Sequence, residues 1–187
     1  MEKLVTPAQA FILAGGQSSR MGTDKAMVPF RGMPMMQHGI QLLSEHFSKI
    51  TIVSNHEKHK MFGLDVIPDA FEKIGPLGGI IAGLRHSTSE LNFFMACDMP
   101  LVPSAVIVAL LEQASNDQCI TTSFQGSRET LCTLYPTSAL PLLETMAIKQ
   151  QYRLHDVLIE LEADVVDVTH LCENNPFINI NTPAELQ

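Results

Sequence analysis

A glycine-rich segment with two basic residues lies near the amino-terminal end of the chain. Gly15 and Gly16 follow a short apolar run, and Arg20 and Lys25 come soon after them. Glycines let the backbone turn tightly and approach a ligand closely, and successive N–H groups can then surround phosphate oxygens. The segment has neither the G-x-G-x-x-G pattern of dinucleotide-binding folds nor the Gly-Lys-Ser/Thr of a P-loop. A surface turn is the alternative, but a turn would not need the two cations. The segment therefore predicts a phosphate-binding loop.

Asp98 is the carboxylate best placed to hold a metal ion. It follows an apolar run at residues 91–97 and precedes Met99-Pro100. A side chain at the carboxyl end of a parallel strand faces the crevice where ligands bind. Magnesium is usually held by one or two carboxylates together with substrate phosphates. We therefore predict Asp98 as a magnesium ligand, the alternative being an aspartate that caps the helix expected near Pro103.

Two histidines three residues apart, His56 and His59, would share one face of a helix. No third ligand is near them in the sequence, so we favour a solvated helix face over a zinc site. Asn55 ends a predicted strand and Asp69 follows a proline, and from the pattern alone both are typical turn residues.

These residues need a sheet that brings strand ends together. Strands alternate with helices through residues 10–115, an order typical of a mainly parallel sheet covered on both faces. We expect strands at 10–14, 50–54, 64–67, 91–97, 118–123, 130–135, 164–168 and 177–180. We expect helices at 36–47, 75–85, 103–114, 141–147 and 154–161, and a terminal one capped by Thr182-Pro183. Polar residues then follow three strands at one edge of the sheet, namely Gly15-Gly16, Asn55 and Asp98.

Composition supports a folded protein without a nucleic-acid partner. The 187 residues are 45 % hydrophobic and 17 % charged, with mean hydropathy +0.13, against about 25 % charged in an average domain. A chain of this length is expected to form one domain, spanning residues 1–187. The net charge of −8 repels a polyanion but leaves room for a small anion at a locally positive site.

The cysteines and apolar runs predict a cytoplasmic protein. Four scattered cysteines form no C-x-x-C pair and are typical of core residues in a reducing compartment. No apolar run approaches the ~18 residues of a membrane span, and the amino-terminal apolar stretch is too short for a signal peptide.

Three segments carry a resemblance to a known family. Leu13-Ala14-Gly15-Gly16-x-Ser18-x-Arg20-Met21-Gly22-x-Asp24-Lys25 resembles the signature of the glycosyltransferase-A-like nucleotidyltransferase superfamily. Gly75-Pro76-Leu77-Gly78-Gly79 and Phe177-x-Asn179-x-Asn181-Thr182-Pro183-x-Glu185-Leu186 resemble two further segments of the molybdenum cofactor guanylyltransferase family. Gly16 favours this branch, because the related cytidylyltransferases usually have alanine there. The chain departs from the family at Gly78, where alanine is common, and at residues 128–131, where a His-Pro-Thr-like stretch is common.

The resemblance implies a fold, a reaction and a set of site residues. The fold is a three-layer α/β/α arrangement around a Rossmann-like, mainly parallel sheet of the nucleotide-diphospho-sugar transferase type. Residues 8–115 would form its nucleotide half and residues 116–187 its acceptor half. The implied reaction transfers GMP from GTP to molybdenum-molybdopterin with Mg²⁺ and releases pyrophosphate. Implied partners are other cofactor-biosynthesis proteins and the molybdoenzymes, or their chaperones, that receive the product.

The same resemblance assigns roles to individual residues. Catalysis is carried onto Arg20, Lys25 and Asp98, with Asp98 as the metal ligand. Nucleotide contacts are carried onto Leu13, Ala14, Gly15, Gly16, Lys25, Asn55, Asp69 and Asp98. Asn179 and Asn181 alternate along the chain and are expected to line the acceptor pocket.

Two other functions remain open. One is a cytidylyl- or uridylyltransferase of the same fold that uses another phosphorylated acceptor. The other is a nucleotide-binding module that releases no pyrophosphate. The joint presence of Arg20, Lys25 and Asp98 favours an enzyme, because a simple binder needs no metal carboxylate.

Overall fold

A mainly parallel sheet forms the centre of the computed structural model, which describes residues 8–15, 24–71 and 73–179. Within these residues the sheet has seven strands in the order β5-β4-β1-β6-β8-β7-β9. Strand β8 runs antiparallel to its neighbours β6 and β7, and the other neighbouring pairs are parallel. The strands are β1 (Gln9–Leu13), β4 (Ile50–Val53), β5 (Asp65–Ile67), β6 (Leu91–Ala96), β7 (Ile120–Phe124), β8 (Ser127–Pro136) and β9 (Asp164–Asp167).

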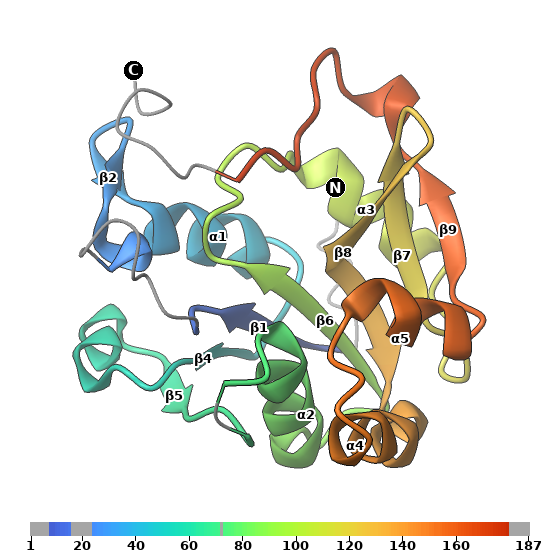
Figure 1. Ribbon diagram of the computed structural model, residues 1–187. Coiled ribbons are helices and arrows are strands. Elements are labelled where there is room, and N and C mark those ends of the chain that lie inside the picture. Colours follow the sequence, from blue (N-terminus) through green and yellow to red (C-terminus); the bar gives the residue numbers. More distant parts are fainter. Residues whose placement is uncertain (1–7, 16–23, 72, 180–187) are drawn as a thin grey trace.

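Helices cover both faces of this sheet (Figure 1). Apolar residues of α1 and α3 pack with one face in one core, and those of α2, α4 and α5 pack with the other face in a second core. The three-layer α/β/α fold predicted from the sequence is therefore confirmed. The helices are α1 (Met35–Ser44), α2 (Pro76–His86), α3 (Ser104–Glu112), α4 (Leu140–Ile148) and α5 (Leu154–Glu160).

The central strands are buried on both faces, which explains their continuous apolar sequences. Every residue of β1, β4 and β6 is buried. Polar residues inside them are paired: Gln9 Nε2 donates to Thr51 Oγ1 at 3.0 Å, and Asn92 Nδ2 donates to Thr137 Oγ1 at 2.9 Å. These hydrogen bonds satisfy buried polar groups that would otherwise destabilise the sheet.

Several short elements were not expected from the sequence. A small hairpin joins β2 (Pro29–Phe30) to β3 (Met33–Pro34) through Arg31 and Gly32, which both have positive φ. Two consecutive positive φ angles are typical of the tight turns that join hairpin strands. The short 3₁₀ helices are η1 (Lys25–Met27), η2 (Glu57–Phe62), η3 (Thr137–Ala139) and η4 (Thr169–Leu171).

The strand predicted at 177–180 is wrong where it can be compared. Residues 177–179 form a turn and irregular backbone, and an Asx-type hydrogen bond from Phe177 N–H to Asn175 Oδ1, at 2.9 Å, bends the chain just before them. Asn179 is therefore not part of a strand in the described residues, and Asn181 lies outside them. The terminal helix predicted from Thr182 lies outside the described residues.

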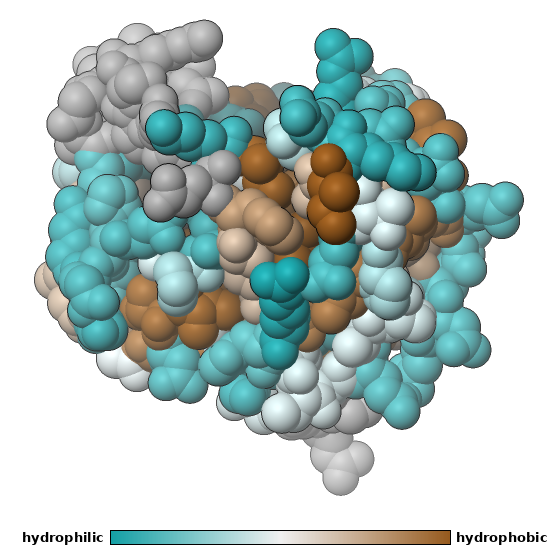
Figure 2. Space-filling view, turned by 60° about the horizontal axis from the view of Figure 1, so that its bottom comes forward, coloured by the Kyte–Doolittle hydropathy of each residue, from teal (hydrophilic) through white to brown (hydrophobic). Residues whose placement is uncertain are grey.

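The surface over α2 and α4 alternates apolar patches with hydrophilic side chains (Figure 2). Large exposed apolar side chains include Ile148 at the end of α4 and Ile159 on α5. None of the described helices combines the length and apolar character needed to cross a membrane.

Candidate active site

A pocket of about 200 Å³ opens where the carboxyl ends of β1 and β6 meet. Ligands of parallel α/β sheets bind at this edge. The pocket gathers residues from both halves of the chain, which are far apart in the sequence. Its lining consists of Leu13, Ala14, Gly15, Asp24, Lys25, Ala26, Asp69, Gly75, Pro76, Gly79, Ala96, Cys97, Asp98, Leu131 and Asn179.

Lys25 and Asp98 meet in this pocket although 73 positions separate them. Lys25 Nζ donates to Asp98 Oδ2 at 3.0 Å, and their side chains are 28 % and 15 % exposed. Asp98 follows β6 directly after Cys97, and Lys25 begins η1. The pair places a cation and a carboxylate where the sequence predicted them, with enough exposure to reach a ligand.

Asn55 holds the backbone and side chain of Asp69. Asn55 Nδ2 donates to Asp69 Oδ2 at 3.0 Å, and Asn55 Oδ1 accepts from Asp69 N–H at 3.1 Å. Burial raises the pKa of the Asp69 carboxyl, although the hydrogen bond from Asn55 opposes this rise. Of the two residues only Asp69 lines the pocket, and Asn55 holds it through these two hydrogen bonds.

Two glycines make room for the Asp69 carboxylate. A Cβ atom on Gly15 would lie 2.9 Å from Asp69 Oδ2, and one on Gly79 would lie 3.1 Å from Asp69 Oδ1. Any larger residue at either position would displace the carboxylate. The glycines of two separate sequence motifs therefore serve the same side chain.

The amino terminus of α2 also faces the pocket. Gly75 precedes it with φ +69 and ψ −154, a conformation open almost only to glycine, and Pro76 occupies the first turn. Backbone N–H groups at a helix amino terminus attract anions. A Cβ on Gly78 would lie 2.8 Å from the Phe71 carbonyl oxygen. Alanine at this position would therefore require the backbone at Phe71 to shift.

Asp24 and His59 form a buried contact beside Lys25 that sequence reasoning missed. Asp24 Oδ2 accepts from His59 Nε2 at 2.8 Å and from Lys58 Nζ at 2.9 Å. Burial acts to raise the pKa of Asp24, but the hydrogen bonds from Lys58 and His59 outweigh it, and the pKa lies below its ordinary value. The solvated face predicted for the two histidines is wrong at His59, whose side chain is 0 % exposed, and correct at His56, which is exposed.

A bulge in β8 borders the pocket at Leu131. Thr121 of β7 pairs with Thr133, but Ser123 pairs with Arg128, so β8 contributes additional residues between these pairs. The Glu129 carboxylate accepts from the backbone N–H groups of Thr130 and Leu131, both at 2.7 Å. These hydrogen bonds stabilise the bulge that presents Leu131 to the pocket, as bulges near sites commonly do.

Burial raises the pKa of Glu129, while its backbone hydrogen bonds lower it and the charge of Asp98 raises it further. This segment, residues 128–131, departs from the family pattern. Of residues 128–131, Leu131 lines the pocket.

The remaining predicted residues fall into two groups. Leu13, Ala14 and Asn179 line the pocket, so the structure brings them together with Lys25 and Asp98. Gly16, Arg20 and Asn181 lie outside the described residues.

The carboxylate oxygens in the pocket suit a magnesium ion that is also bound by phosphates and water. Within the described residues they do not form a complete site for a metal ion bound only by protein side chains. Among residues 8–15, 24–71 and 73–179, no group of three His, Cys, Asp or Glu side chains could hold a metal ion. The Asp98 carboxylate offers hard oxygen atoms, and magnesium needs only one or two carboxylates when phosphates and water complete its shell. The His56–His59 pair gains no third ligand in the described part of the chain, so a zinc site there has no support.

Cys97 is a buried neighbour of Asp98, in agreement with the core role expected for the cysteines. It is 8 % exposed, and burial together with the charge of Asp98 raises the pKa of its thiol far above the ordinary value. A thiol held protonated is a poor nucleophile.

The fold and this pocket are those of an α/β protein with a ligand site at the carboxyl ends of its parallel strands. Solved structures with the same fold include CMP:2-keto-3-deoxy-manno-octonic acid synthetase complexed with CTP, with TM-score 0.72 and 13 % identity over 96 % of this chain and 95 % of that one. Another is molybdopterin-guanine dinucleotide biosynthesis protein A from Archaeoglobus fulgidus, with TM-score 0.78 and 25 % identity over 95 % of this chain and 94 % of that one.

The chain belongs to the MobA-like NTP transferase family, whose model matches residues 10–165. A molybdenum cofactor guanylyltransferase from Photobacterium profundum is 34 % identical over 94 % of this chain and 92 % of its own length. A probable molybdenum cofactor guanylyltransferase from Carboxydothermus hydrogenoformans is 31 % identical over 94 % of this chain and 91 % of its own length. The family predicted from the three sequence segments is thus confirmed, and the chain is an enzyme.

Proposed function

We propose that the enzyme transfers GMP from GTP to molybdenum-molybdopterin and releases pyrophosphate, forming the guanine dinucleotide of the cofactor. The observation that carries the proposal is the meeting of Lys25, Asp98 and Asp69 in one pocket at the carboxyl ends of β1 and β6. The names of relatives that match nearly the whole chain support the same reaction.

In the proposed reaction, a terminal phosphate oxygen of the acceptor forms a bond to the α-phosphorus of GTP. The bond between that phosphorus and the bridging oxygen toward the β-phosphate breaks, and the electron pair leaves with pyrophosphate. The attacking phosphomonoester is largely dianionic at neutral pH because its second pKa is about 6. The enzyme therefore needs no strong general base, and its task is to bring two anions together.

Lys25 and the backbone N–H groups near Gly15 and the start of α2 would neutralise and orient the triphosphate. Lys25 Nζ lies in the pocket at 3.0 Å from Asp98, and the α2 amino terminus faces the same space. Arg20, outside the described residues, is proposed to add a further cation to the same loop. Asp98 would hold Mg²⁺, which when bound neutralises phosphate charge and aligns the reacting groups.

Asp69 is proposed to recognise the guanine base. A carboxylate can accept hydrogen bonds from guanine N1–H and the 2-amino group, and cytosine offers no such donor pair. Asn55 bonds to Asp69 through both ends of its amide, and of the carboxylate oxygens only Oδ2 accepts from Asn55, which leaves Oδ1 to accept from a ligand. The base would therefore contact Asp69, held in place by Asn55.

The acceptor is proposed to enter beside Leu131 and Asn179, which line the pocket from the second half of the chain. Asn181, outside the described residues, is proposed to contact the acceptor as well, as the family resemblance implies. We further propose a cytoplasmic reaction, because all four cysteines are free thiols and three of them are buried. The product would pass to molybdoenzymes or their chaperones, and other cofactor-biosynthesis proteins would supply the acceptor.

Pyrophosphate release tests this function. The enzyme is incubated with Mg²⁺ and each of GTP, ATP, CTP or UTP, with and without molybdenum-molybdopterin. We expect release with GTP only when the acceptor is present, and little with the other three. Release with CTP or UTP would replace the proposal by a same-fold pyrimidine transferase. Binding of GTP with no release in the presence of acceptor would make the chain a binding module.

A further inference from the structure

We propose that His59 is a positioning residue that acts through Asp24 to hold Lys25 in its catalytic place. The inference rests on the function proposed above, because it needs Lys25 to stabilise the reacting phosphates. His59 itself lines no part of the pocket, whereas Asp24 and Lys25 both do.

The contact between His59 and Asp24 joins two segments that are 35 positions apart. His59 lies in η2, between β4 and β5, and its side chain is 0 % exposed, while that of Asp24 is 10 % exposed. Because Asp24 Oδ2 is an acceptor, His59 Nε2 must carry the proton that it donates across 2.8 Å. A charge-assisted hydrogen bond shielded from water is stronger than a neutral one.

Asp24 in turn fixes the turn that begins with Lys25. Its other oxygen, Oδ1, accepts from Ala26 N–H at 3.1 Å, so Asp24 is the amino-terminal cap of η1. Its backbone carbonyl accepts from Met27 N–H at 3.0 Å. The two carboxylate oxygens of Asp24 thus have different partners. Oδ1 stabilises the backbone turn at Lys25, and Oδ2 connects this turn to His59 of η2.

Packing limits the freedom of the imidazole ring. The ring lies 5.6 Å from that of His56 in an edge-on arrangement and 6.3 Å from that of Phe62. No hydrogen-bond partner among the described residues faces Nδ1, so Nε2 makes the single polar contact seen for this ring. Lys58 also contacts Oδ2, but its side chain is 50 % exposed, and exposed ion pairs stabilise little. The buried histidine is therefore the main support of Asp24.

The structure predicts a loss in turnover when this support is removed. A displacement of about 1 Å at a catalytic group can lower the rate about 10²-fold. We expect His59→Met to lower kcat about 10- to 100-fold. His59→Gln, whose amide nitrogen can replace Nε2, should recover kcat to within about threefold of the wild type. The KM for the nucleotide should change less than kcat in His59→Met, because Lys25 acts mainly on the reacting phosphates.

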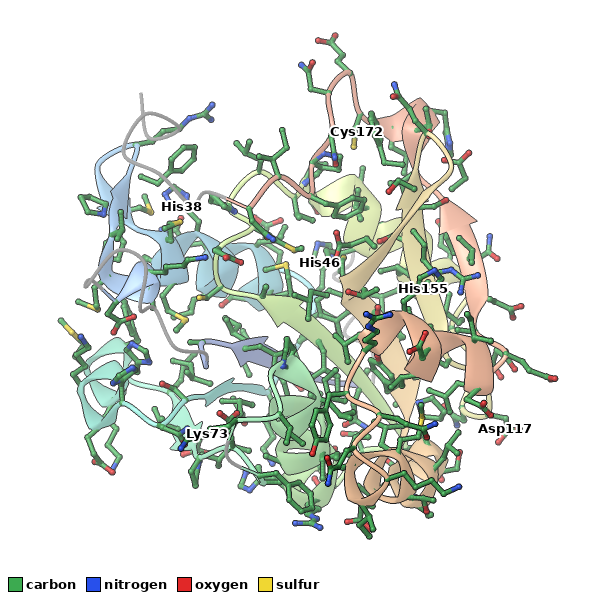
Figure 3. All side chains as sticks on the ribbon, viewed as in Figure 1. His38, His46, Lys73, Asp117, His155 and Cys172 are labelled. Carbon is green, nitrogen blue, oxygen red and sulfur yellow. The ribbon has the colours of Figure 1, made fainter. Side chains whose placement is uncertain are left out.

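His46→Met is the matched control. His46 Nε2 meets Ser104 Oγ at 2.7 Å, near the end of α1 and outside the pocket lining (Figure 3). This variant removes a histidine hydrogen bond of similar length, so its kcat should stay within about threefold of the wild type. Urea unfolding of each variant shows whether a loss of turnover comes from a loss of folded protein.

A double-variant cycle separates positioning from general damage. If His59 acts through Lys25, then His59→Met should cost less than about threefold in the Lys25→Ala background. An equal loss in both backgrounds, or wild-type turnover in His59→Met, would overturn the inference. Asp24→Asn provides a second route if His59→Met does not fold, and it should show the same dependence on Lys25.

The cycle also distinguishes this inference from the proposed function. If the wild type uses a nucleotide other than GTP, the proposed function fails. The same cycle is then measured with that nucleotide, and its result decides the role of His59 independently.

Discussion

Lys25 and Asp98 carry opposite charges into one pocket, and the proposed chemistry needs both of them there. A carboxylate alone would repel a triphosphate, and a lysine alone would leave no ligand for a divalent ion. Their ion pair, at 3.0 Å, holds both side chains at the pocket. The pair is part-buried, so its charges act on a ligand with less screening by water.

Alanine at either position should cost activity rather than folding. Removing one electrostatic contact to the reacting group commonly lowers the rate about 10²- to 10³-fold. We expect this loss in pyrophosphate release for Lys25→Ala and for Asp98→Ala. Lys60→Ala is the control, because Lys60 pairs with the exposed Glu57 at the surface. A variant of Lys25 or Asp98 with near wild-type turnover would remove that residue from the mechanism.

At the residue scale, the sequence predicts the charged groups that line the pocket better than the contacts that support them. Asp98 follows a strand and Lys25 ends a glycine-rich segment, and a pattern can locate such positions, whereas Asp69 was assigned a role only through the family resemblance. The link from His59 to Asp24 depends on a contact between distant segments. Spacing along the chain suggested a solvated helix face instead, because a contact with a residue 35 positions away leaves no local signal.

At the scale of the elements, the close packing of helix α2 on the sheet requires glycine at several of its positions. Helix α2 packs so closely on the sheet that its glycines meet side chains of β1 and β6. Continuous apolar strands and alternating helices predicted the layers and most element positions within a few residues. The bulge in β8 and the β2–β3 hairpin were missed, because a register shift and a two-residue turn leave little periodic pattern.

Two buried helix glycines should respond oppositely to alanine. A Cβ on Gly83 would lie 2.5 Å from Phe94 Cε1 and 3.0 Å from Phe11 Cδ1, and these two rings stack at 4.8 Å. Overpacking of this kind costs about 1–3 kcal/mol, against a gain of up to about 1 kcal/mol in helix propensity. We therefore expect Gly83→Ala to lower the free energy of unfolding by about 1–2 kcal/mol.

Gly39 of α1 provides the comparison. A Cβ there would lie 3.3 Å from Met95 Cε, the end of a flexible side chain that can move. Gly39→Ala should leave stability unchanged or raise it by up to about 1 kcal/mol. Urea unfolding measures both variants, and a Gly83→Ala protein as stable as Gly39→Ala would contradict the close packing of α2.

At the scale of the whole molecule, one sheet joins the two parts of the chain that meet at the site. Strand β6, in the first part of the chain, pairs with β8, in the second part, over five residue pairs. The two cores lie on opposite faces of the same sheet, and each contains residues from both halves. In a chain with a net charge of −8, Lys25 and the amino terminus of α2 are positive groups at the pocket, beside the carboxylates of Asp24, Asp69 and Asp98.

The two halves should therefore unfold together. Cys97 belongs to the first half and to one core, and Cys119 belongs to the second half and to the other core. Burial raises the pKa of both thiols, that of Cys119 to about 12, so neither should react in the folded protein. With increasing urea we expect both to become reactive at the same midpoint as the loss of helical circular dichroism. Separate midpoints would show that the halves are independent domains.

A crystal structure with GTP and Mg²⁺ tests the proposed nucleotide site most directly. We expect the triphosphate against Gly15, Lys25 and the start of α2, guanine beside Asp69, and the divalent ion on the Asp98 carboxylate. Nucleotide bound elsewhere, with this pocket empty, would contradict the assignment of all these residues.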